Sequence, residues 1–130
     1  MTIRRGIVLA SFTLALAAAT PAWSQGALAA LDPDKDGTVD LAEAKAAATK
    51  LFDKLDGDHD GTLDKKELRG RVTGKDFTGA DPDKDGTIDQ KEYLAIVEQR
   101  FNAADPDKDG TLDAKELGSK AGKALLQLVQ

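Results

Sequence analysis

Residues 32–43 have the sequence DPDKDGTVDLAE, and the chain repeats this twelve-residue pattern at 56–67, 81–92 and 105–116. Successive copies start 24, 25 and 24 residues apart. Each copy places acids at positions 1, 3, 5, 9 and 12 and glycine at position 6. One such stretch can arise by chance in an acidic loop, whereas four complete copies in register indicate four copies of one binding site.

The repeated pattern, D-x-D-x-D-G-x-x-D-x-x-E, is that of an EF-hand metal loop. Hard cations need six to eight oxygen ligands, which acids at positions 1, 3 and 5 supply when glycine at position 6 lets the backbone turn sharply. The carbonyl at position 7 adds an oxygen, and the position-12 glutamate would bind through both of its oxygens. The predicted metal ligands, position 9 included, are Asp32, Asp34, Asp36, Thr38, Asp40 and Glu43; Asp56, Asp58, Asp60, Thr62, Asp64 and Glu67; Asp81, Asp83, Asp85, Thr87, Asp89 and Glu92; and Asp105, Asp107, Asp109, Thr111, Asp113 and Glu116.

The acid at position 9 has two compatible roles. It can ligate the ion, directly or through water. Together with the glutamate at position 12 it also forms a D-x-x-E pattern, close to a capping box that opens the next helix.

The number of acids bears on the identity of the ion. Of the 23 acidic residues in the chain, 20 lie in the four loops, five to a loop. Like charges about 4 Å apart repel by roughly 4 kcal/mol at an effective dielectric near 20, so a more highly charged ion gains more from this ligand set. The sequence therefore predicts trivalent lanthanide ions, up to four, with calcium as a weaker or alternative ligand. Magnesium prefers a compact shell with retained water, and zinc and copper lack their usual ligands because the chain has no Cys and one His.

Loop position 2 holds Pro33, Pro82 and Pro106, and in the second loop it holds Gly57. Proline fixes φ and removes an N–H donor. It either stiffens these loops, which would sharpen selection by ion size, or merely ends the preceding helix. His59, at position 4 of the second loop, is predicted to be an exposed non-ligand.

The short connectors predict an all-α fold, a small helical bundle with four EF-hand metal loops joined by unusually short connectors. Only 12 residues separate the first loop from the second, and 12 separate the third from the fourth, so one helix must leave one loop and enter the next. Glycines break the middle connector, 68–80, and Gly118 and Gly122 weaken a final helix. The apolar stripes of the two long helices are predicted to form the core; they are Leu41, Ala44, Ala48, Leu51, Phe52 and Leu55, and Tyr93, Ile96, Val97, Phe101 and Ala104.

Apolar residues at loop position 8 predict a short two-strand bridge between paired loops. Adjacent loops lie at the two ends of one rigid helix and cannot easily pair. We therefore expect the second loop to pair with the third, and the first with the fourth.

The first residues have the features of a secretory signal peptide. Two arginines precede an apolar run, Ile7–Ala19, and a small-x-small triplet ends at Ser24. The run is short for a membrane span. We predict a signal peptide over 1–24 and a four-EF-hand metal-binding domain over 25–130, exported to the periplasm and free of the membrane after cleavage. The acidic balance argues against a nucleic-acid partner.

The residues resemble the lanmodulin family, periplasmic lanthanide-binding EF-hand proteins. The resemblance rests on four hands with connectors of 12 to 13 residues, on DPDKDGT loops, on Asp at position 9 and on flanking stretches such as Gly122-Lys123-Ala124-Leu125. It implies a preference for lanthanides over calcium, a disorder-to-order response to metal, and a role beside a lanthanide-dependent alcohol dehydrogenase or an uptake system. Gly57 and His59 depart from the family's usual loop, and Asp105 stands where relatives often carry Asn.

Three functions are consistent with these features. The leading one is a lanthanide carrier, buffer or sensor in the periplasm. The first alternative is an exported EF-hand calcium buffer or sensor, and the second is a calcium-stiffened adhesion module similar to dockerin. An enzyme is not predicted, since no nucleophile–base constellation is present. The thin core and the repelling loops also predict that metal binding and folding are coupled.

Overall fold

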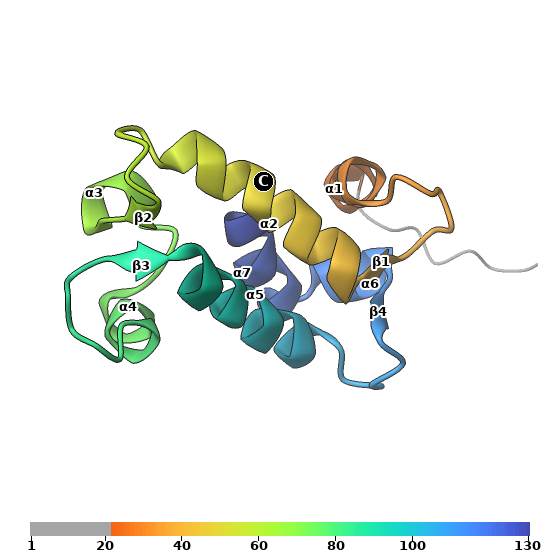
Figure 1. The fold of residues 1–130 in the computed structure, drawn as a ribbon. Coiled ribbons are helices and arrows are strands. Elements are labelled where there is room, and N and C mark those ends of the chain that lie inside the picture. The colour runs from red at the N-terminus through yellow and green to blue at the C-terminus, as the bar shows by residue number, and fades with distance from the viewer. Residues whose placement is uncertain (1–21) are drawn as a thin grey trace, which may run out of the picture.

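The computed structural model describes residues 22–130, and the fold they form is mostly helical (Figure 1). The predicted signal peptide falls almost wholly outside the described residues. The helices are α1 (Ala22–Leu31), α2 (Leu41–Leu55), α3 (Lys65–Leu68), α4 (Gly74–Ala80), α5 (Gln90–Ala104), α6 (Ala114–Gly118) and α7 (Lys120–Val129). The strands are β1 (Val39–Asp40), β2 (Thr62–Leu63), β3 (Ile88–Asp89) and β4 (Thr111–Leu112).

Helices α2, α5 and α7 pack against one another and form the centre of the molecule (Figure 1). In α2 the buried side chains are Ala44, Ala48 and Phe52, while the predicted flanks Leu41, Leu51 and Leu55 are half-buried. All five residues of the predicted α5 stripe are buried. Phe52 and Tyr93 meet edge to face across the two helices, with ring centroids 5.6 Å apart. The stripes thus form the core, as predicted.

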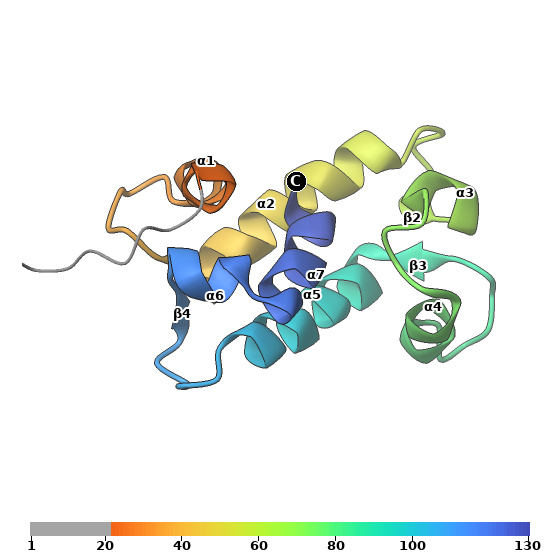
Figure 2. The ribbon, with the colours of Figure 1, turned by 180° about the vertical axis from the view of Figure 1, so that it is seen from behind.

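Each long helix connects two metal loops, as the 12-residue connectors predicted. We number the loops 1 (32–43), 2 (56–67), 3 (81–92) and 4 (105–116). Helix α2 begins inside loop 1 and ends at the start of loop 2, and α5 has the same relation to loops 3 and 4. The loops therefore lie at the ends of the molecule, and Figure 2 shows the same separation from behind.

The loops pair in the predicted combination. Antiparallel β1 and β4 set Val39 opposite Leu112, so loop 1 pairs with loop 4. Antiparallel β2 and β3 set Leu63 opposite Ile88, so loop 2 pairs with loop 3. All four position-8 side chains have no exposed surface. The two loop pairs lie at opposite ends of the α2–α5–α7 bundle in both views (Figures 1 and 2).

The middle connector and the last helix are both interrupted. Arg69 and Gly70 adopt positive φ, 49° and 78°, so α3 stops and α4 starts separately. The predicted final helix is in fact two helices. Ser119 divides them, because it ends α6 and its side chain also accepts a hydrogen bond from Gly122 N at the start of α7.

Helix α1 was not predicted from the sequence. It precedes loop 1 as the entering helix of the first hand and buries Ala27 and Leu31 against the bundle. The predicted cleavage point after Ser24 falls inside this helix, so a mature chain starting at Gln25 would retain both buried residues. Among the described residues, no helix is long and apolar enough to cross a membrane.

Candidate metal-binding loops

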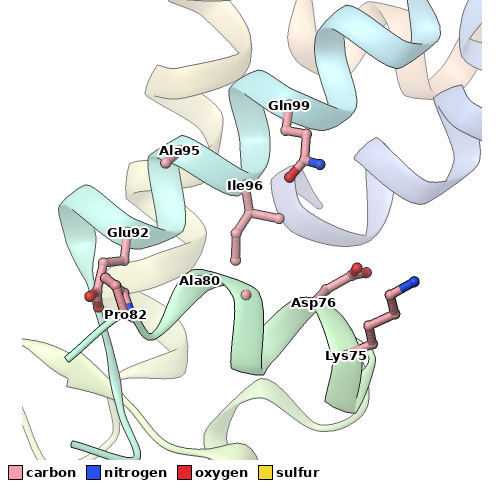
Figure 3. A pocket seen from close by; sticks show the side chains of 9 residues that line it. Lys75, Asp76, Ala80, Pro82, Glu92, Ala95, Ile96 and Gln99 are labelled. Carbon is pink, nitrogen blue, oxygen red and sulfur yellow. The ribbon is translucent and has the colours of Figure 1, made fainter. Parts of the chain in front are cut away.

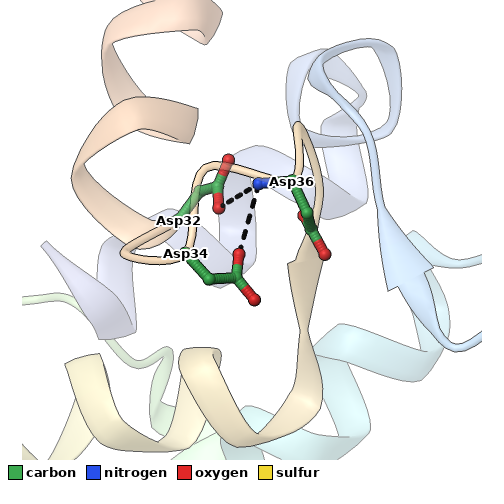
Figure 4. Close-up of side chains that lie close together, drawn as sticks. All are labelled: Asp32, Asp34 and Asp36. Carbon is green, nitrogen blue, oxygen red and sulfur yellow. Dashed lines mark hydrogen bonds between the residues drawn. The ribbon is translucent and has the colours of Figure 1, made fainter.

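The four loops bring carboxylates together as their spacing predicts. In each loop the acids at positions 1 and 3 join a third acid in a cluster whose ligand atoms all lie within 4.8 Å of one another. The third acid is position 5 in loops 1 and 3, Asp36 and Asp85, and position 12 in loops 2 and 4, Glu67 and Glu116. Figure 4 shows Asp32, Asp34 and Asp36 of loop 1 gathered around one turn of backbone. Three oxygen donors at this separation suit a hard cation.

The acid at position 1 is the anchor of each loop. It is 6–7% exposed in all four loops, although it is a carboxylate. In loop 1 the side chain of Asp32 accepts hydrogen bonds from Asp36 N at 3.1 Å and Gly37 N at 2.9 Å. Asp32 can accept from Gly37 N because the backbone turns sharply at Gly37, whose φ is 87°. Glycine adopts this left-handed conformation without strain. These bonds close the loop around the place where an ion would lie.

Loop 4 differs at this anchor. In loops 1, 2 and 3 the Oδ1 atom of the position-1 aspartate accepts a bond from the position-5 N–H. Asp105 Oδ1 is buried and, among the described residues, has no hydrogen-bond partner. A buried carboxylate oxygen left without a partner is costly, and a bound cation would satisfy it. The donor set of loop 4 therefore fits a metal ion.

The pKa values of the acids at positions 1 and 3 are shifted in opposite directions in loops 1 and 4. Partial desolvation raises the pKa of Asp105, but the adjacent Asp107 carboxyl and the Gly110 N–H outweigh it and leave the pKa below its usual value. The Asp105 side chain in turn raises the pKa of Asp107. The same opposition separates Asp32 from Asp34. Two carboxylates this close repel each other when both are ionised, and a bound cation would offset that repulsion.

Positions 9 and 12 form a capping box at the start of the following helix in every loop. In loop 1 the Asp40 side chain accepts from Glu43 N at 2.7 Å, and Glu43 Oε2 accepts from Asp40 N at 2.9 Å. The same reciprocal pair is present in the other three loops. Capping is therefore an observed role of the position-9 aspartate, and ligation by it stays a prediction. Desolvation by burial raises the pKa of Glu43, against the Asp40 N–H, which lowers it.

Position 7 contributes more than its backbone. In loop 1 the Thr38 N–H and the Thr38 hydroxyl both donate to Asp36 Oδ1, at 2.8 and 2.9 Å. The equivalent pair recurs in the other loops. Threonine at this position therefore fixes the position-5 carboxylate, a role that the sequence pattern did not reveal.

Position 4 carries a strained residue in every loop. Lys35, His59, Lys84 and Lys108 have φ between 54° and 60°. All four are exposed, as was predicted for His59. This left-handed residue lies two positions before the left-handed glycine, and the two together fold the loop back on itself, so part of the loop's closure works against backbone preference.

A hollow of about 470 Å³ opens between α4 and α5 beside loop 3 (Figure 3). Pro82 and Glu92 of loop 3 lie together at one end, and Lys75 and Asp76 of α4 lie at the other. Ile96 projects from α5 toward α4. The position-12 glutamate of loop 3 thus borders a space outside the loop.

Three side chains hold α7 through hydrogen bonds that the sequence did not reveal. Tyr93 donates its hydroxyl to Leu128 O at 2.8 Å, and burial raises the pKa of this phenol to about 12, so it stays a donor. Arg71 donates to the Gln127 and Gln130 carbonyls, and Arg100 donates to that of Ala124. Tyr93 and Arg71 thus bind carbonyls of residues 127–130, where a helix end leaves carbonyls without intrahelical partners, and Arg100 binds a carbonyl earlier in α7.

Comparison with known proteins agrees with the geometry. A family model described as EF hand matches residues 49–72 and 96–119, which include loops 2 and 4 with the C-terminal parts of α2 and α5. The chain is 57% identical over 71 residues to "Lanmodulin" of Methylorubrum extorquens. This match covers 54% of the chain and 53% of that relative, so the chain spans about half the length of the curated relative it matches. The chain is therefore all-α, carries four EF-hand-like acidic loops and is similar to lanmodulin over about half of its length.

Proposed function

We propose that the four loops bind trivalent lanthanide ions selectively, with calcium as a weaker ligand. The observation that carries this proposal is the concentration of five carboxylates in each loop, three of them with oxygens within 4.8 Å of one another. A divalent ion would leave such a loop with a formal charge of −3, and a trivalent ion would leave −2. The lanmodulin relative supports the same choice of ion.

The proposed role is that of a carrier, buffer or sensor exported to the periplasm. The signal-peptide features of the first 24 residues support export. The four loops and the lanmodulin relative favour metal binding over catalysis. A lanthanide-dependent alcohol dehydrogenase or a lanthanide uptake system is the proposed partner, as the family resemblance implies.

Metal binding is proposed to drive folding. The acids of an empty loop repel, and the core contains few aromatic side chains, namely Phe52, Phe77, Tyr93 and Phe101. Occupied loops would bring β1 to β4 and β2 to β3, so that the position-8 side chains become buried. The expected result is a large gain in helical circular dichroism when metal is added to chelated protein. Unchanged helicity would refute the coupling.

A competition titration tests ion identity. Tyr93 follows the last ligand of loop 3 directly, so it is placed to sensitise the luminescence of terbium in that loop. We expect terbium luminescence to reach half-saturation in the presence of a large excess of calcium. Displacement of terbium by millimolar calcium would instead support the second candidate, an exported EF-hand calcium buffer or sensor, which the EF-hand match favours equally.

A further inference from the structure

Loop 2 contains a hydrogen bond that the other loops cannot form. Its position 2 is Gly57, and the Gly57 N–H donates to Glu67 Oε1 at 3.0 Å. The residue at this position in the other loops is Pro33, Pro82 or Pro106. Proline has no N–H, so no equivalent bond to the position-12 glutamate exists there.

The bond fixes Glu67 from a second side. Glu67 Oε2 accepts from Asp64 N at 3.0 Å, which is the capping-box contact that every loop has. With Gly57, both carboxylate oxygens are held by backbone N–H groups from opposite ends of the loop. Each oxygen keeps a further lone-pair direction for a metal. Glu67 already lies with Asp56 and Asp58 in the loop-2 cluster.

We propose that Gly57 is a positioning residue of the loop-2 metal site, an inference that rests on the proposed function of the loops. In the folded loop its N–H holds the Glu67 carboxylate inside the loop. As loop 2 folds around an ion, this bond offsets part of the entropy that the Glu67 side chain loses on becoming ordered. In loop 2 this bond is present where the other loops have proline.

The backbone around Gly57 can accommodate both a test variant and a matched control. Asp56, which precedes Gly57, has a ψ of 79°, close to the 74° of Asp81 and the 76° of Asp105, which precede prolines. Gly57→Pro is therefore compatible with the chain before it; it removes the N–H and fixes φ at this residue. A Cβ at Gly57 would lie 3.9 Å from Glu67 Oε1, an ordinary contact, so Gly57→Ala keeps the donor and serves as the matched control.

The test is a lanthanum titration of the whole protein followed by amide NMR. The position-6 glycines Gly37, Gly61, Gly86 and Gly110 report on their own loops, because each N–H donates to the position-1 aspartate at 2.9–3.0 Å. We expect Gly57→Pro to weaken loop 2 about tenfold relative to Gly57→Ala, the scale of one lost hydrogen bond to a charged group. Loops 1 and 4 should be unchanged, as should the helicity of the metal-free protein.

Equal affinities of the two variants at loop 2, or tighter binding by Gly57→Pro, would overturn the proposal. The same ratio measured with calcium tests the positioning role independently of ion identity, so a failure of lanthanide selectivity would not be mistaken for a failure at Gly57. Should Gly57→Pro perturb the whole fold, hydrogen exchange of the Gly57 amide in the lanthanum-loaded wild-type protein tests whether this N–H holds Glu67. Protection supports the proposal, and free exchange at this exposed residue refutes it.

Discussion

Gly122 is a point of close approach between α6 and α7. Its Cα faces the end of α6 so tightly that a Cβ there would overlap the Glu116 carbonyl oxygen and lie 2.5 Å from that of Leu117. The sequence pattern marks this glycine as a weakness in a final helix. In the structure it is instead the reason that α7 can fold back across the bundle directly after loop 4.

We expect Gly122→Ala to destabilise the metal-loaded protein by about 3 kcal/mol or more, because the obstacle is backbone and cannot rotate away. The matched control is Gly79→Ala in α4, where nothing lies within 4 Å of the added Cβ. That change should be neutral or stabilise by about 0.5–1 kcal/mol, since alanine is the better helix former. Urea unfolding of both variants at the same metal saturation measures the difference. Equal stabilities would show that α6 and α7 are not held at this distance.

At the scale of the helices and strands, Arg100 joins three elements. From α5 it donates to Ala124 O of α7 at 2.6 Å and to Arg71 O of the α3–α4 connector at 3.3 Å, and it forms an ion pair with Asp76 of α4 at 3.2 Å. Its side chain is only 12% exposed. One guanidinium therefore ties the segment between loops 2 and 3 to the helix that follows loop 4.

Arg100→Gln is expected to cost about 1–3 kcal/mol of stability, because part-buried carbonyls lose a charged donor. Lys45→Gln provides the control. It removes an ion pair of similar length, Lys45 to Glu98 at 2.9 Å, whose side chains are 37% and 49% exposed. Such a surface pair contributes about 0–1 kcal/mol. Thermal unfolding of both variants under one metal condition measures the contrast, and a larger loss for Lys45→Gln would contradict it.

The loops, the two long helices and the loop pairing could be predicted because each depends on short-range spacing. A 12-residue connector admits one helix, and a rigid helix keeps adjacent loops apart. The α7 anchors depend on long-range placement instead, since Arg71 and Tyr93 meet α7 only after the bundle forms. Helix α1 was missed because the predicted signal peptide covered its start. The Gly57 bond had one signal in the sequence, the missing proline, but its acceptor became visible only in the structure.

At the scale of the whole molecule, two loop pairs occupy opposite ends of one bundle (Figures 1 and 2). Loop pairing joins segments distant in sequence, since β1 and β4 lie at nearly opposite ends of the described chain. Folding thus requires like-charged loops to come together at both ends. The stability of the metal-free fold should therefore depend on how many loop carboxylates are ionised.

The pKa shifts of the loop acids determine whether the metal-free fold gains or loses stability as the pH falls. Neighbouring carboxyls and burial raise the pKa of the position-3 aspartates, Asp34, Asp58, Asp83 and Asp107, and of Glu43, Glu92 and Glu116. These groups bind more protons in the folded than in the unfolded chain at mildly acidic pH, so their protonation stabilises the fold as pH falls. Asp32, Asp81 and Asp105 have lowered pKa values, so their protonation destabilises the fold once pH falls below the usual aspartate range.

We therefore expect the metal-free protein to gain helicity and thermal stability as the pH is lowered from neutral to the upper edge of the carboxyl range, and to lose both at lower pH. The metal-loaded protein should lose stability throughout the same descent, because protons compete with the ion for the loop oxygens. Circular dichroism melts of demetallated and lanthanum-saturated protein at matched pH measure both curves. High salt is the control, since screening the repulsion between exposed loop acids should flatten the metal-free rise. A metal-free stability that falls steadily from neutral pH would mean that repulsion among the loop carboxylates does not oppose folding.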